Sequence, residues 1–133
     1  MIHRVLVIGR WVVDFLFAEE DYDIDGVLAC MHDSGASRTV MAQAEELMDE
    51  REDNCGFTFS NPRARRAVVV IGPTTSGREF QDTFVHEIYH LASAIADSIG
   101  VPLSSEHPAY MAGDSARALA EVVCELGCDH CRR

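Results

Sequence analysis

The segment of residues 83–100, TFVHEIYHLASAIADSIG, carries the residues best suited to chemistry. It contains the pattern His-Glu-x-x-His, with the histidines at His86 and His90 and the glutamate at Glu87. Residues four apart on a helix lie on one face about 6 Å apart, which lets both imidazoles reach one metal ion. The pattern predicts a single Zn²⁺ bound by His86 and His90, with Glu87 beside it as a proton acceptor.

The helix that holds this pattern is expected to run from about Gly77 to Ser98 and to stop at Gly100. Apolar residues recur at helical spacing along one face, at Phe80, Phe84, Ile88, Leu91, Ile95 and Ile99. The two histidines fall on a separate, polar face. Tyr89, inside the pattern, is expected to pack in the core.

A zinc site of this kind needs a third protein ligand, which we expect from the helix that follows the Gly100-Val101-Pro102 turn. Its first turn offers Glu106 and His107. Glu106 is the preferred ligand because it begins a polar stripe that continues through Tyr110. His107 is the alternative.

Two imidazoles and one carboxylate leave the fourth position of Zn²⁺ open for water, whose pKa the metal lowers to roughly 7. The predicted function is zinc-dependent hydrolysis of peptide bonds, with Glu87 as general base and the phenol of Tyr110 as a candidate donor to the oxyanion. The alternative function is a catalytically silent domain that zinc stabilises and that binds a partner protein.

Three stretches resemble the compact zincins with a glutamate ligand, in particular short zincin-like proteins of phages and bacterial mobile elements. These stretches are GFTFSN, VVVIGPTTSGREFQDTFVHEIYHL and SSEHPAYMAGD. The resemblance implies that the strand before the His-Glu-x-x-His helix is a sheet edge beside the cleft. Residues 67–71 match that strand, so Val69, Val70 and Ile71 are the expected sites for an extended peptide substrate.

The chain departs from the larger zincins in one position. Those of the thermolysin type carry an aspartate four residues after the ligand glutamate, where this chain has Tyr110. A different residue must therefore orient the zinc-bound histidine, and Asp114 and Asp97 are the candidates.

The order of the remaining elements predicts a small α+β domain that spans residues 1–133. Residues 4–17 are expected to be a strand bent at Gly9-Arg10. Two short helices are expected to follow, the first capped by Asp23 or Asp25 and the second by Ser37. Residues 54–61 predict a turn and a short strand, and RRAVVVIGP predicts a further strand of a short mixed sheet, stopped by Gly72-Pro73. A last helix is expected to run from Ser104 or Ser105 to about Leu126.

The overall composition of the chain disfavours two classes of partner, nucleic acids and membranes. A net charge of −11 disfavours a nucleic acid, and no uncharged run approaches the roughly 20 residues that a membrane crossing needs. An odd count of five cysteines favours reduced thiols in the cytoplasm over a disulfide framework. Three of them lie at the C-terminus, where either plain thiols or a second zinc site is expected, at Cys124, Cys128 and Cys131.

Overall fold

The structure, a computed structural model, describes residues 1–132 and has the predicted α+β architecture. Its four strands are β1 (Ile2–Ile8), β2 (Trp11–Phe17), β3 (Gly56–Asn61) and β4 (Arg66–Ile71). Its five helices are α1 (Ile24–Asp33), α2 (Arg38–Glu50), α3 (Gly77–Ser98), α4 (Glu106–Ala118) and α5 (Ala120–Gly127).

The strands form one mixed sheet in the order β1-β2-β4-β3. The pairs β1–β2 and β3–β4 are antiparallel, whereas β2 and β4 run parallel. A hairpin turn at Gly9, whose φ of +60° suits glycine, joins β1 to β2. Residues 4–17 are therefore not one bent strand, as predicted, but parts of two antiparallel strands that reverse direction at Gly9-Arg10. The sheet has two edges, β1 and β3.

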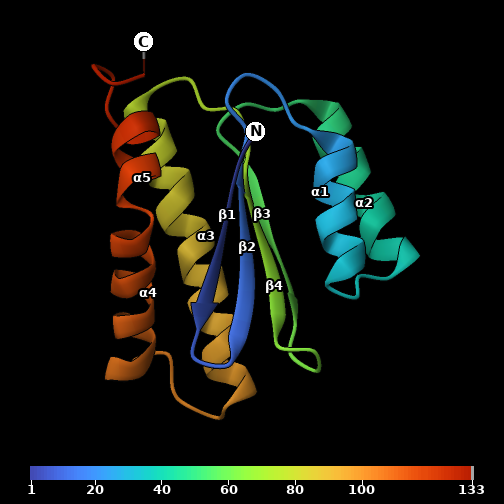
Figure 1. Cartoon of the computed structure of the whole chain (residues 1–133), viewed down its shortest axis with the longest axis vertical. Coiled ribbons are helices and arrows are strands. Elements are labelled where there is room, and N and C mark those ends of the chain that lie inside the picture. Colours follow the sequence, from blue (N-terminus) through green and yellow to red (C-terminus); the bar gives the residue numbers. More distant parts are fainter. Residues whose placement is uncertain (133) are drawn as a thin grey trace.

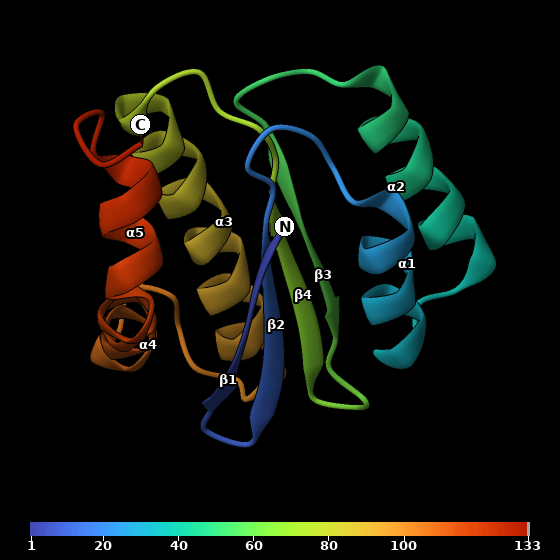
Figure 2. The ribbon, with the colours of Figure 1, turned by 45° about the horizontal axis from the view of Figure 1, so that its top comes forward.

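Helices cover both faces of the sheet, so the molecule has three layers (Figure 1). Helices α1 and α2 lie against one face, and the other face carries α3, with α4 and α5 packed beside it (Figure 2). Successive side chains of β2 point to opposite faces of the sheet and so enter two different cores. Phe15 and Phe17 face α3, whereas Leu16 faces α1 and α2. The sheet therefore separates the surroundings of α3 from those of α1 and α2.

The predicted last helix is in fact two helices that meet at Leu119, the only residue between α4 and α5. Leu119 is 2% exposed and belongs to the core beside α3. Figure 2 shows that the chain changes direction between α4 and α5. The break lies at the residue whose side chain is buried. No signal of this break exists in the sequence, because the segment contains neither proline nor glycine at that point.

Among residues 1–132, no helix combines the length and the apolar character that a membrane crossing requires.

Candidate metal centre

Helix α3 positions the His-Glu-x-x-His residues, and its start is fixed by a side-chain cap. The hydroxyl of Ser76 accepts a hydrogen bond from the backbone N–H of Glu79 at 3.1 Å. The predicted apolar stripe is buried from Phe80 to Ile95, whereas Ile99, just past the helix, is half exposed. Burial of this stripe fixes the rotation of α3 and thereby the direction of each residue of the pattern.

Glu87 lies on the buried side of α3, while the two histidines lie at its solvent edge. Glu87 is only 2% exposed, whereas the side chain of His86 is 67% exposed. The Nε2 atoms of His86 and His90 are 3.1 Å apart, and the nearer oxygen of Glu87 is 3.8 Å from Nε2 of His86. The three side chains therefore converge from one helix, as the pattern predicts.

Strand β3 supplies the partner of the buried carboxylate. The hydroxyl of Thr58 donates a hydrogen bond to Oε2 of Glu87 at 3.0 Å, which leaves Oε1 directed toward His86. Gly56 on the same strand permits this close approach, because a Cβ there would lie 3.1 Å from Cγ of Glu87 and 2.5 Å from the carbonyl oxygen of Val70. Thr58 is a site residue that was not predicted from the sequence; its place in a strand that alternates polar and aromatic side chains was the available signal.

The residues present fit a divalent metal ion. Two nitrogens that each lie about 2.05 Å from a tetrahedral Zn²⁺ are roughly 3.3 Å apart, close to the 3.1 Å between His86 and His90. A hollow of about 390 Å³ opens in front of the pair, between α3 and β3, with room for further ligands. Within residues 1–132, the donor atoms that gather here come from His86, Glu87 and His90.

The structure does not bring the predicted third ligand to this group. Glu106 is exposed at the first position of α4, and α4 contacts α3 and β1, at the sheet edge opposite β3. His107 and Tyr110 line a different cavity beside β1, so neither the alternative ligand nor the predicted oxyanion donor faces the histidines. The prediction failed because the turn after Gly100 directs the chain toward β1, a choice that helical spacing does not specify.

The two aspartates that were predicted to orient a zinc-bound histidine also do not join the group around His86 and His90. Asp114 lines the cavity beside β1 with His107 and pairs with Arg117. Asp97 follows His90 by two helical turns and is not among the donor groups that gather around the histidines in the described chain.

Two further expectations are wrong. The segment of residues 67–71 is not a sheet edge, because β4 pairs with β2 on one side and β3 on the other. Val69, Val70 and Ile71 are almost completely buried and have no free edge for a peptide; the edge beside the histidines is β3. Tyr89 is 57% exposed rather than buried, because the face of α3 that meets the sheet passes through Glu87 and Ile88.

The C-terminal cysteines form a loose group near the end of α5. The sulfur atoms of Cys124 and Cys131 are 4.0 Å apart. Hydrogen bonding with Cys128, and secondly with Cys124, raises the pKa of Cys131 to about 11. Hydrogen bonding with Cys131 lowers the pKa of the neighbouring Cys128 thiol. Plain thiols and a second zinc site therefore both stay predictions for this tail.

His3, Asp14 and Cys30 form a second group of possible metal ligands, on the opposite face of the sheet. This group is better explained as an ion-pair network than as a metal site. The buried carboxylate of Asp14 contacts Nε2 of His3 at 2.7 Å and Nη2 of Arg66 at 3.4 Å. Cys30 lies nearby, and burial followed by the carboxylate of Asp14 raises the pKa of its thiol. Both carboxylate oxygens of Asp14 are thus occupied, by the imidazole of His3 and the guanidinium of Arg66.

Comparison of the chain with protein-family models, curated proteins and solved structures finds no match. The resemblance to compact zincins stays a prediction.

Proposed function

We propose that the protein is a zinc-dependent hydrolase of peptide bonds whose centre is the group His86, Glu87 and His90. The observation that carries the proposal is the approach of the two Nε2 atoms to 3.1 Å with a buried carboxylate 3.8 Å from one of them. Exposed histidine side chains without a shared ligand are free to turn away from each other into solvent, whereas His86 and His90 converge. A carboxylate that is 2% exposed needs a compensating partner or function.

In this proposal His86 and His90 hold the ion through Nε2. Bound zinc acidifies water and polarises a carbonyl group, which is the chemistry that amide hydrolysis requires. Glu87 serves as general base at Oε1, the oxygen directed toward His86, and later returns the proton to the leaving amine. Thr58 keeps Oε2 occupied, so that the base has one orientation.

Strand β3 is the element suited to an extended peptide substrate. It pairs with β4 on one side only, and it forms one wall of the hollow that contains the histidines. An extended peptide that pairs with the outer edge of β3 would pass beside His86 and His90. This assignment replaces β4, the strand that the sequence suggested.

A catalytically silent zinc-stabilised domain is the second candidate. It is favoured by one specific observation: in the described part of the chain, only the carboxylate of Glu87 joins the two imidazoles. If Glu87 is itself a zinc ligand, it cannot also act as a free base, and the site is structural.

We also propose a reducing, cytoplasmic location. All the cysteines are free thiols in the structure: Cys30, Cys55, Cys124, Cys128 and Cys131. Free thiols are typical of proteins in a reducing compartment.

The experiment that tests hydrolysis is an unbiased cleavage assay. Zinc-loaded protein is incubated with a pool of peptides from digested proteome, and new termini are counted by mass spectrometry. We expect new termini with the wild type and at least about a hundredfold fewer with Glu87→Gln, the usual effect of losing a general base. Glu106→Gln is the matched control and should cleave like the wild type. Equal cleavage by wild type and Glu87→Gln would show that the activity comes from elsewhere.

A further inference from the structure

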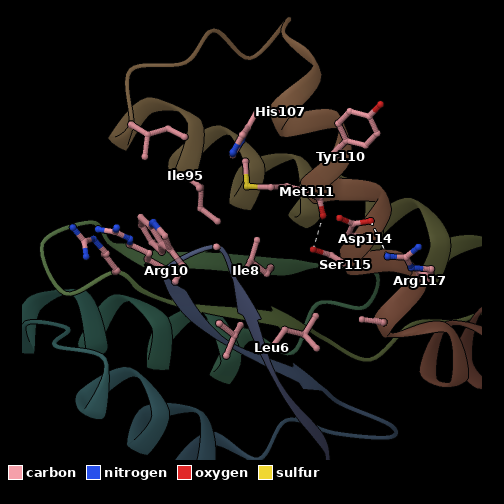
Figure 3. A pocket seen from close by; sticks show the side chains of 16 residues that line it. Leu6, Ile8, Arg10, Ile95, His107, Tyr110, Met111, Asp114, Ser115 and Arg117 are labelled. Carbon is pink, nitrogen blue, oxygen red and sulfur yellow. Dashed lines mark hydrogen bonds and ion pairs between the residues drawn. The ribbon is translucent and has the colours of Figure 1, made fainter.

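A large cavity lies away from the metal centre, between α4 and the β1–β2 hairpin. Its volume is about 760 Å³, which falls in the range of small-molecule sites, roughly 300–1,000 Å³. Figure 3 shows His107, Ile95 and Met111 pointing from the helices toward Ile8 of β1. The cavity is a recess between two elements rather than a flat surface.

The walls of this cavity are mainly apolar. Aliphatic and aromatic side chains come from β1, the start of β2, α3 and α4: Leu6, Ile8, Trp11, Ile95, Ile99 and Met111. Ile99 remains half exposed at the rim. An apolar ligand body of modest size would therefore gain free energy by displacing water from these walls.

One end of the cavity carries positive charge. Arg10 in the β1–β2 turn and Arg65 in the β3–β4 turn both line it, and neither makes an ion pair within residues 1–132. Along α4 the only carboxylate of the lining, Asp114, is neutralised by Arg117 at 3.1 Å. Arg10 and Arg65 are both exposed at the mouth of the recess, so their guanidinium groups are accessible to a ligand.

We infer that this cavity binds a small amphiphile with a carboxylate head and an apolar body, such as a medium-chain fatty acid. Arg10 and Arg65 bind the carboxylate, and the apolar walls hold the chain. A planar guanidinium matches a carboxylate through two parallel hydrogen bonds, which an alcohol or an amine cannot provide. This site is independent of the metal centre, because Ile95 and Ile99 face β1 whereas His86 and His90 face β3.

The chain contains its own reporter for this site. Trp11 is the single tryptophan of the sequence and lines the cavity. Sodium octanoate is titrated into the full-length protein at concentrations below micelle formation, and the emission of Trp11 is recorded. We expect a saturable change in emission with octanoate.

Variants that change the charge of the cavity separate the contribution of the carboxylate to octanoate binding from that of the apolar chain. Arg10→Gln and Arg65→Gln should each weaken octanoate binding about fivefold, the upper range for an exposed ion pair. Ile99→Glu at the half-exposed rim should weaken binding, whereas Ile99→Lys should not. Arg38→Gln, on α2 across the sheet, is the matched control and should leave binding unchanged. Circular dichroism confirms that each variant is folded.

Three results would overturn the inference. The first is the absence of a saturable change in Trp11 emission. The second is binding of 1-octanol that is as tight as that of octanoate, with no effect of either arginine variant, which would define a purely apolar surface. The third is an emission change that follows protein dilution rather than octanoate, which would mean that a second copy of the chain occupies the cavity.

Discussion

Replacement of Thr58 by valine should destabilise the protein by about 2 kcal/mol, since hydrogen bonds to charged groups contribute roughly 1.5–3 kcal/mol. Valine keeps the shape of threonine but removes the hydroxyl that donates to Oε2 of Glu87 at 3.0 Å. Because Glu87 is 2% exposed, water replaces the lost donor poorly and the carboxylate is left partly unsatisfied. Urea unfolding of the metal-free protein, followed by circular dichroism, measures the difference.

The matched control is Thr58→Ser, which keeps the hydroxyl and should stay within about 1 kcal/mol of the wild type, the effect of one methyl group. In a Glu87→Gln background the Thr58→Val penalty should fall to about 1 kcal/mol, because the remaining hydrogen bond is between neutral groups. The reasoning fails if Thr58→Val and Thr58→Ser are equally stable, or if the penalty is the same with Gln at position 87.

Three other predictions concern different parts of the molecule. Gly56→Ala should lower stability, measured by urea unfolding, because its Cβ would meet the carbonyl oxygen of Val70 and Cγ of Glu87; an unchanged stability would contradict the close packing. Burial, and secondly the charge of Cys55, raises the pKa of Tyr22 to about 12, so the contribution of Tyr22 to stability should be constant below pH 10 and fall between pH 10 and 12 by up to about 1.4 kcal/mol per pH unit. Tyr22→Phe should remove this alkaline loss and cost little at pH 7, since the buried hydroxyl has no hydrogen-bond partner; a variant with the same alkaline loss would refute the assignment. Serine replacement of all three tail cysteines should leave the zinc content at the wild-type value by elemental analysis, and loss of the metal would place the centre in the tail.

Local features of the fold were predictable from sequence because they depend on neighbouring residues. Asp23, Ser37 and Ser76 cap α1, α2 and α3 as their side-chain chemistry suggests. The turn at Gly9 and the convergence of His86 and His90 follow equally from residues a few positions apart.

Features that join distant segments were not predictable. The order β1-β2-β4-β3 places β4 in the interior, although its own sequence only indicates a buried strand. The side of α3 on which α4 packs depends on the turn after Gly100, and this separates Glu106 from the histidines. Thr58 reaches Glu87 across 29 positions of the chain, a pairing that no local pattern encodes.

The most direct test of the metal centre is the zinc content of the purified protein by elemental analysis, with Glu87→Gln and Glu106→Gln beside the wild type. Our account predicts one zinc per chain in all three, because His86 and His90 hold the ion, Glu87 acts as base, and Glu106 lies elsewhere. Loss of zinc in Glu87→Gln would make Glu87 a ligand and favour the silent domain. Loss in Glu106→Gln would mean that α4 packs differently from the structure described. A wild type without zinc after equilibration with the metal would contradict the central claim.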